Sequence, residues 1–238
     1  MTGPLLELVN VHAGYRSLSV LHNISLTIPE GSFTTIIGPN GHGKTTLLRC
    51  ISGLIPLSEG DVIFDNTRLK DLRADQIVER GIVHVPQGDI IYPDMTVRDN
   101  LLMGAYLPSV SADADERLGE VHRIFPRLAE RRNQIASTLS GGERRMLSIG
   151  RGLMTGGRLL MIDEPSLGLA PVVVDQIYEV VADLKKQKRT ILLVEENASR
   201  VMELADAIYL VDNGQLVWQG TPDELMSHTE IIETYLGG

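Results

Sequence analysis

An eight-residue run early in the chain constrains the fold more than any other feature. Residues 38–45 read Gly-Pro-Asn-Gly-His-Gly-Lys-Thr, which is the spacing of a phosphate-binding loop. Its glycines let backbone N–H groups turn onto phosphate oxygens, Lys44 reaches the outer phosphates, and Thr45 can ligate Mg²⁺. Residues 33–37 before it have a buried-strand pattern, and residues 45–51 after it open a helix whose N-terminus would face the anion. The residues expected to surround the phosphates are Gly38, Pro39, Asn40, Gly41, His42, Gly43, Lys44, Thr45 and Thr46.

Two adjacent carboxylates follow a second apolar run, residues 159–162, at the edge where open α/β sheets bind ligands. Asp163 can hold Mg²⁺ directly or through water, and Glu164 can polarise the water that attacks a terminal phosphate. Gln87 closes another predicted strand and could reach the same metal or water. An isolated Asp-Glu pair would favour a solvated turn, but the phosphate loop upstream favours catalysis. The candidate catalytic residues are thus Lys44, Gln87 and Glu164, and the candidate metal ligands are Thr45, Gln87 and Asp163.

The segment Leu-Ser-Gly-Gly-Glu at residues 139–143 has two interpretations. Ser140 and Glu143 form a capping box, which by itself indicates only a well-made helix start. The two glycines between them lose helix propensity, which suggests that something approaches the bare backbone closely. Free N–H groups at a helix N-terminus bind anions, so a second phosphate contact is the alternative. Its residues would be Ser140, Gly141, Gly142 and Glu143.

The remaining patterns predict one domain with an insertion. Residues 5–37 alternate like strands of a mainly antiparallel sheet, and strand signals vanish between about 89 and 155, where Leu118, Val121, Phe125 and Leu128 recur at helical spacing. Strand and helix patterns then alternate, with a helix expected over residues 198–205. We expect a core of residues 1–88 and 156–238 and a helical subdomain of residues 89–155.

Composition excludes several classes of protein. The chain has 238 residues with a formal net charge of −9, which argues against nucleic acid as a partner. Its one cysteine, Cys50, precludes an internal disulfide and is expected to be a small core residue. No apolar run approaches the roughly 20 residues that span a bilayer. We therefore expect a cytosolic or peripheral protein.

The sequences of residues 139–143, 146–151 and 163–171 resemble those of the nucleotide-binding subunits of ABC transporters, and the resemblance covers essentially the whole chain. It is most similar to the smaller ATPase subunit of branched-chain amino-acid importers or their urea and amide relatives. The resemblance implies a P-loop NTPase (RecA-like) α/β core with an N-terminal antiparallel β subdomain and an inserted α-helical subdomain. It also implies ATP and Mg²⁺ as cofactors, with Tyr15 stacking on adenine and Gln87 joining the core to the helical subdomain.

The same resemblance implies partners. The segment 139–143 of one ATPase subunit would close over the ATP of a second, in a homodimer or heterodimer, and separate integral membrane permease subunits would supply the transport path. A solute-binding protein would act indirectly, and the chain would lie peripherally on the inner face of the cell membrane. The apolar, turn-rich surface from Gly88 to about Tyr106, including Ile91 and Tyr92, is expected either to receive the permease or to pack in the core.

The chain departs from the family pattern at His42, in the phosphate loop, at Ala170 and at Glu196. Ala170 replaces a usual aspartate, and Glu196 replaces a histidine that contacts the γ-phosphate, so Glu196 is a further candidate catalytic residue. An ionised carboxylate only accepts hydrogen bonds, and strand alternation lets only one of Glu195 and Glu196 face the nucleotide. We expect the His42 side chain to point to solvent.

Other functions remain open at this point. ATPase subunits that export lipid or polysaccharide have a similar sequence at residues 140–145. A soluble ABC-type ATPase would act outside transport. A regulatory module with little turnover is suggested by Glu196 and Ala170 but opposed by Lys44 and Glu164.

Overall fold

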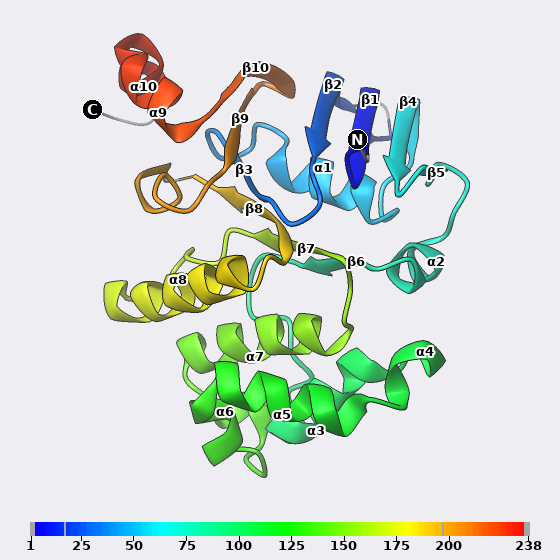
Figure 1. Ribbon diagram of the computed structural model, residues 1–238, viewed down its shortest axis with the longest axis vertical. Coiled ribbons are helices and arrows are strands. Elements are labelled where there is room, and N and C mark those ends of the chain that lie inside the picture. The colour runs from blue at the N-terminus through cyan, green and yellow to red at the C-terminus, as the bar shows by residue number, and fades with distance from the viewer. Residues whose placement is uncertain (1–2, 17, 197, 236–238) are drawn as a thin grey trace.

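The computed structural model describes residues 3–16, 18–196 and 198–235. The N-terminal sheet lies at one end, a larger sheet crosses the middle, and a group of helices lies at the other end (Figure 1). The strands are β1 (Leu6–Tyr15), β2 (Leu18–Ile28), β3 (Phe33–Ile37), β4 (Leu57–Phe64), β5 (Thr67–Arg68), β6 (Ile82–Val85), β7 (Leu159–Asp163), β8 (Thr190–Glu195), β9 (Ala207–Asp212) and β10 (Gln215–Gly220). The α-helices are α1 (Lys44–Ile51), α2 (Ala74–Glu79), α3 (Val97–Leu102), α4 (Pro108–Ser111), α5 (Ala114–Ile124), α6 (Pro126–Glu130), α7 (Gly141–Met154), α8 (Pro171–Lys186), α9 (Pro222–Ser227) and α10 (Thr229–Tyr235).

The N-terminal sheet is antiparallel, in the order β2-β1-β4-β5. The register pairs Leu6 with Ile28 and Leu8 with Leu26, so the apolar residues that alternate along both strands share one buried face. This confirms the predicted antiparallel pairing. The prediction is wrong for residues 33–37, because β3 leaves this sheet and pairs in parallel with β8 and β9. All five residues of β3 are buried, as expected for a strand covered on both faces.

The central sheet positions the site. Its order is β10-β9-β3-β8-β7-β6, and every pair from β9 to β6 is parallel. The carboxyl ends of β3, β6, β7 and β8 therefore lie along one edge, where ligands of such sheets bind. The phosphate loop, Gln87, Asp163 and Glu195 lie at or just beyond these four ends.

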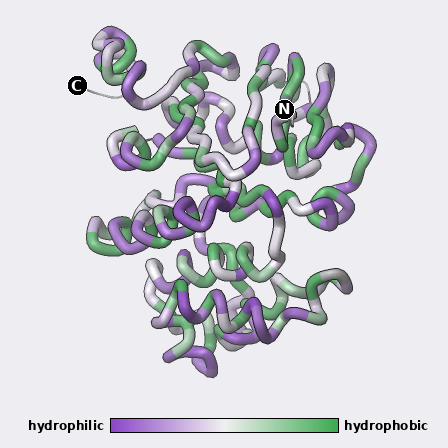
Figure 2. The backbone as a smooth tube through the Cα atoms, viewed as in Figure 1, coloured by the Kyte–Doolittle hydropathy of each residue, from purple (hydrophilic) through white to green (hydrophobic). Residues whose placement is uncertain are grey.

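Two apolar clusters cover the two faces of this sheet. One face packs on α1 and the N-terminal sheet, and the other packs on α8, α7 and the helices α3, α5 and α6. In Figure 2 the hydrophobic colour follows the strands and alternates with hydrophilic stretches around the helices. Between β6 and β7, a stretch that the structure describes in full, the only β pairing is a single bridge between Thr96 and Ile135. The insertion is therefore helical and shares a core with the sheet.

Two predicted helices are altered. The period through Leu118, Val121, Phe125 and Leu128 is divided, because Pro126 cannot donate a helical hydrogen bond and leaves Phe125 in a non-helical conformation between α5 and α6. The helix expected over residues 198–205 is only the 3₁₀ turn Ala198–Arg200 followed by turns. The chain must return quickly to β9 there, because Asp206 is bound to Phe33 through both its side chain and its backbone N–H.

Candidate active site

The phosphate loop joins β3 to α1 and closes around a buried lysine. The Nζ of Lys44 donates to the carbonyl oxygens of Gly38, at 2.7 Å, and Pro39, at 3.0 Å. Gly38 has no alternative at its position, since a Cβ there would lie 2.0 Å from the carbonyl oxygen of Val211. Beside the lysine is a cavity of about 100 Å³, which is lined by Gly41, Gly43, Lys44, Thr45, Thr46 and Glu164.

Asp163 is fully buried at the end of β7 and has one oxygen to spare. Its Oδ1 accepts a hydrogen bond from the Thr45 hydroxyl at 3.2 Å, whereas its Oδ2 is buried without a hydrogen-bond partner. Burial raises the pKa of Asp163, because a charged carboxylate loses its water there. An unpaired carboxylate oxygen beside a hydroxyl fits Mg²⁺, which prefers oxygen ligands and would offset that loss. Two of the three predicted ligands, Thr45 and Asp163, therefore lie together.

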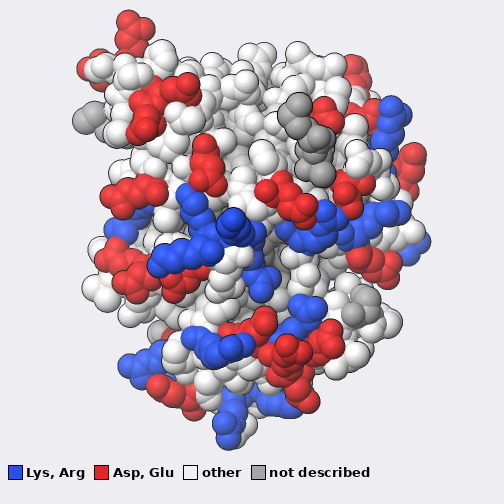
Figure 3. Space-filling model, viewed as in Figure 1, with Lys and Arg blue, Asp and Glu red and all other residues white. Residues whose placement is uncertain are grey.

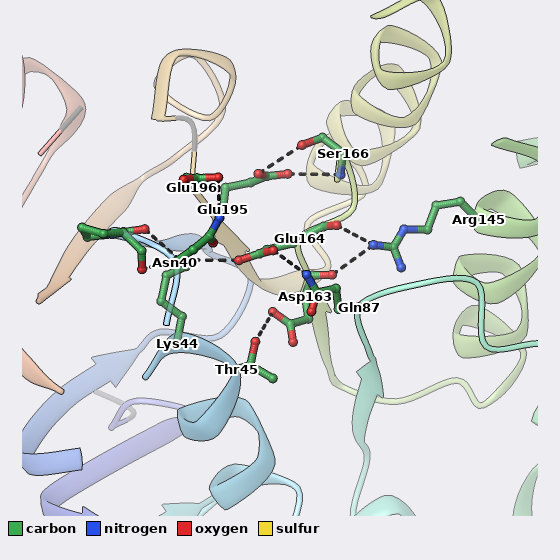
Figure 4. A network of polar contacts seen from close by, with 12 residues as sticks. Asn40, Lys44, Thr45, Gln87, Arg145, Asp163, Glu164, Ser166, Glu195 and Glu196 are labelled. Carbon is green, nitrogen blue, oxygen red and sulfur yellow. Dashed lines mark hydrogen bonds and ion pairs between the residues drawn. The ribbon is translucent and has the colours of Figure 1, made fainter. Parts of the chain in front are cut away.

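Glu164 occupies the centre of the site, in a left-handed backbone conformation with φ of 42°. Its Oε2 accepts a hydrogen bond from Nε2 of Gln87 at 2.7 Å, and its Oε1 lies 3.5 Å from Nζ of Lys44 (Figure 4). Three of the four predicted catalytic side chains, Lys44, Gln87 and Glu164, thus meet, although they come from three different strand ends. Gln87 turns its amide nitrogen toward Glu164, so its assignment as a metal ligand has no support from this contact.

Arg145 of α7 holds this arrangement together, and the sequence reasoning missed it. The side chain is 2% exposed, yet it forms no ion pair among the described residues. Its guanidinium donates instead to backbone carbonyl oxygens on two loops, at the ends of β6 and β7 (Figure 4). The acceptors are Pro86, Gly88, Asp163, Glu164 and Pro165. The sequence did contain a signal for Arg145. This residue lies four positions before Ile149, so its charge falls on the apolar face of the predicted helix.

The contact with Glu164 explains how an unusual backbone conformation persists. A non-glycine residue in the left-handed region costs about 1 kcal/mol or more and survives only where its surroundings fix it. Arg145 binds the carbonyl oxygens of Asp163, Glu164 and Pro165, while the Glu164 N–H donates to Val194 at 2.9 Å. The direction of the Glu164 carboxylate is therefore set by the backbone that carries it.

The two glutamates at the end of β8 point in different directions. Glu195 is buried and accepts hydrogen bonds from Ser166 and Tyr178. Glu196 turns to the phosphate loop, where its Oε2 accepts a hydrogen bond from Nδ2 of Asn40 at 2.7 Å. Only one of them faces the loop, as the strand alternation predicts. The next residue, Asn197, lies outside the described residues.

The segment at residues 140–143 forms the predicted capping box. The Ser140 hydroxyl accepts from the Glu143 N–H at 3.3 Å, and the Ser140 N–H donates to Oε2 of Glu143 at 2.9 Å. The two glycines of this segment differ in why a side chain is absent. A Cβ on Gly142 would lie 2.4 Å from Cγ1 of Val173 in α8, so internal packing explains it, whereas a Cβ on Gly141 would meet nothing closer than 3.8 Å. Only Gly141 remains as bare backbone without an internal cause.

The side chains of His42 and Tyr15 both lie near the phosphate loop. The expectation that His42 points to solvent is wrong, because its Nδ1 lies 2.6 Å from Oδ1 of Asp212 at the end of β9. The hairpin between β9 and β10 passes close to the loop there, and Gly214 N–H donates to the His42 carbonyl at 3.0 Å. Tyr15 ends β1 with a half-exposed ring, and its hydroxyl accepts from Arg49 at 3.0 Å. Stacking on adenine stays a prediction.

Comparison with known proteins gives the same family along the whole chain. Residues 21–167 match the family model described as ABC transporter. The high-affinity branched-chain amino acid transport ATP-binding protein BraG of Pseudomonas aeruginosa is 38% identical over 234 residues, which are 98% of this chain and 100% of that protein. The probable branched-chain amino acid transport ATP-binding protein LivF of Archaeoglobus fulgidus is 34% identical, over 98% of this chain and 99% of its own.

Solved structures of ABC transporter cassettes have the same fold as this chain. An ATP-binding cassette of an ABC transporter in its ADP conformation superposes with a TM-score of 0.83 at 29% identity, covering 98% of each chain. A nucleotide-free cassette gives a TM-score of 0.82 at 28% identity, covering 97% of this chain and 98% of its own. Both likenesses include the core and the helical insertion, so they confirm the predicted fold class.

The packing of α7 on α8 yields a paired test. Gly142→Ala should be less stable than Gly141→Ala by about 1–3 kcal/mol, because only the first forces a methyl group into Val173. Both changes gain similar helix propensity, so the difference isolates the clash. Thermal unfolding should then separate the two melting temperatures by about 2–10 °C. Equal melting temperatures would refute the packing explanation for Gly142.

Proposed function

The chain belongs to the ABC transporter family, and we propose that it is the ATP-hydrolysing subunit of an importer for branched-chain amino acids or related small polar solutes. The observation that carries the proposal is that Glu164 contacts both other side chains at one sheet edge: its Oε1 lies 3.5 Å from Nζ of Lys44, and its Oε2 accepts a hydrogen bond from Nε2 of Gln87 at 2.7 Å. The amino-acid class rests on the names of the relatives. Nothing in the site favours export, a soluble role outside transport, or a regulatory module over this function.

In this proposal each of these side chains has a separate role in hydrolysis. The phosphate loop would bind the β and γ phosphates through its backbone N–H groups, and Lys44 would exchange its carbonyl contacts for phosphate oxygens. Glu164 would orient the attacking water and accept its proton, while Gln87 holds the carboxylate in place from the other side. Thr45 and Asp163 would hold Mg²⁺, which neutralises charge on the transferred phosphate.

The segment 140–143 would serve a second ATPase subunit. Within the parts of the chain that the structure describes, its hydrogen bonds and ion pairs stay inside the helical insertion and none reaches the phosphate loop. The N-terminus of α7, which this segment forms, could therefore bind the ATP of a partner subunit in a homodimer or a heterodimer. The partner would in turn complete the site of this chain.

A half-open surface beyond Gln87 fits the permease. A cavity of about 230 Å³ lies between β6 and the helical insertion. Tyr92, Met103 and Tyr106 line this cavity. The loop that carries Tyr92 is fixed by Asn100, which binds both the N–H and the carbonyl of Tyr92. For Ile91 the structure agrees with the second of the two alternatives, because this side chain is half-buried against the core cluster. The exposed residues are Ile90, Tyr92, Met95, Met103 and Tyr106.

The remaining assignments follow from this role. We keep the division into a core of residues 1–88 and 156–238 and a helical subdomain of residues 89–155. None of the helices in the described residues is long and apolar enough to cross a bilayer. We propose a peripheral position on the inner face of the membrane, with a solute-binding protein acting through the permease. Figure 3 shows acidic and basic side chains interleaved on the visible face.

Two variants separate binding from turnover. Lys44→Ala should abolish ATP binding or turnover, because the phosphate charge loses its buried cation. Glu164→Gln should still bind ATP while turnover falls by about 10² or more, because an amide cannot accept the proton. Size-exclusion chromatography with ATP should show Glu164→Gln as a dimer and Lys44→Ala as a monomer. Loss of ATP affinity in Glu164→Gln would contradict the role given to this carboxylate.

The transport role is tested with labelled leucine. Vesicles that carry this chain, its permease subunits and the binding protein should accumulate leucine, and Tyr92→Glu should reduce uptake several-fold with ATPase activity of the isolated chain unchanged. Met226→Glu is the control, since it places the same charge on an exposed apolar site of α9. Ile91→Glu should instead lower stability. Equal uptake by Tyr92→Glu and Met226→Glu would remove the surface from the proposal.

Variants at Glu196 test whether the two ATP sites of a subunit pair hydrolyse ATP at different rates. We propose that the phosphate-loop site of this chain is the slower of an asymmetric pair, because Glu196 can only accept hydrogen bonds while ionised and Ala170 weakens communication. Glu196→His should then raise ATP hydrolysis or leave it unchanged. Asn40→Ala is the matched variant, because it removes the same hydrogen bond from the other side. A clear fall in turnover with Glu196→His would overturn the asymmetric arrangement.

A further inference from the structure

Glu195 is a buried carboxylate that forms no ion pair with any residue that the structure describes, and it is next in sequence to the residue that faces the phosphate loop. It is 3% exposed at the end of β8. Its Oε1 accepts hydrogen bonds from the Tyr178 hydroxyl at 2.7 Å and from the Ser166 N–H at 3.3 Å, and its Oε2 accepts from the Ser166 hydroxyl at 3.2 Å. Figure 4 shows the carboxylate turned toward Ser166 and away from the phosphate loop.

This arrangement is costly unless the contacts are kept. Burial raises the pKa of Glu195, and the charge of Glu164 adds to that effect. A buried carboxylate is tolerated where several donors replace its water, and here three neutral donors do so. No cation lies within ion-pair distance of it among the residues that the structure describes. A hydrophobic residue would fill the same place at lower cost, so the position demands an acceptor.

The acceptor fixes the loop that follows the catalytic glutamate. Ser166 is two residues after Glu164, and Arg145 binds the carbonyls of the residues between and before them. The short segment is thus held from two sides, by a guanidinium that takes its carbonyl groups and by a carboxylate that takes the Ser166 N–H and hydroxyl. Since Glu164 lies in a left-handed conformation, release of either side lets its backbone relax.

We propose that Glu195 is a positioning residue for ATP hydrolysis, which holds Ser166 and through it aims the Glu164 carboxylate. Tyr178 completes the same unit, because its hydroxyl fixes the rotamer of Glu195 from α8. The end of β8 then serves two loops at once, with Glu195 tied to Ser166 and Glu196 tied to Asn40. This role rests on the proposed function, because it requires that Glu164 activates the attacking water.

The effect should appear in turnover and leave nucleotide binding intact. Glu195 forms no hydrogen bond or ion pair with the described residues of the phosphate loop, so the ATP dissociation constant should stay within about twofold. A displacement of the reacting group by about 1 Å can cost up to 10²-fold in rate. We therefore expect kcat to fall about tenfold or more in Glu195→Ala. Tyr178→Phe removes one of three donors and should lower kcat by a smaller factor.

The conservative variant separates positioning from chemistry. In Glu195→Gln, the amide oxygen can still accept from the Ser166 N–H, and the amide nitrogen can donate to the Ser166 or Tyr178 hydroxyl oxygen, since a hydroxyl also accepts. We expect this variant to retain at least about half of the wild-type kcat. Glu179→Gln is the matched control, because it removes an exposed carboxylate next to Tyr178 and should change nothing.

The experiment compares these variants in the full chain with its transporter partners. ATP affinity is measured with a fluorescent nucleotide, turnover by phosphate release, and folding by thermal unfolding. If Glu195→Gln is as inactive as Glu195→Ala, the charge itself participates and the positioning role is overturned. Equal losses in affinity, turnover and stability would also overturn it. If Glu195→Ala does not fold, Glu195→Gln and Tyr178→Phe decide by the same criteria.

Failure of the proposed function would look different. If the wild-type chain with its partners releases no phosphate from ATP, both the proposed function and the positioning role fall. If the wild type turns over, Glu164→Gln is inactive and Glu195→Ala keeps its kcat, the positioning role alone is wrong.

Discussion

Parallel pairing of β3, β8, β7 and β6 is the constraint on which the site depends. Parallel strands all end at the same edge, so the phosphate loop, Gln87, Asp163 and Glu195 must meet there although they lie far apart in sequence. The strands are mostly apolar, and the acidic groups Asp163 and Glu195 stand at the last residues of β7 and β8. Folding the sheet therefore assembles the chemistry.

The same edge concentrates buried charge, and the chain compensates for it in two ways. Lys44 and Glu164 lie close enough to attract each other, whereas Arg145 and Glu195 are solvated by backbone groups and neutral hydroxyls. Such partners neutralise no charge, so they keep the site polar while fixing its geometry. Asp163 is the exception, since one of its oxygens is left for a ligand.

Local patterns made the chemistry predictable, and contacts across the fold did not. The phosphate loop, the acidic pair and the capping box of Ser140 and Glu143 depend on residues within a few positions of each other, and the structure places them as expected. Arg145, Tyr178 and the Asn40 contact of Glu196 join segments separated by up to 156 residues, which spacing cannot reveal. The errors at residues 33–37 and 198–205 have the same origin, because tertiary pairing decided their structure.

Gly142 gives the contact between α7 and α8 a further meaning. α8 begins at Pro171, only a few residues after the catalytic Glu164, and its Val173 sits directly on the first turn of α7. A shift of α8 toward α7 would therefore press Val173 onto the first turn of α7, because the space at Gly142 has no room for even one further methyl group.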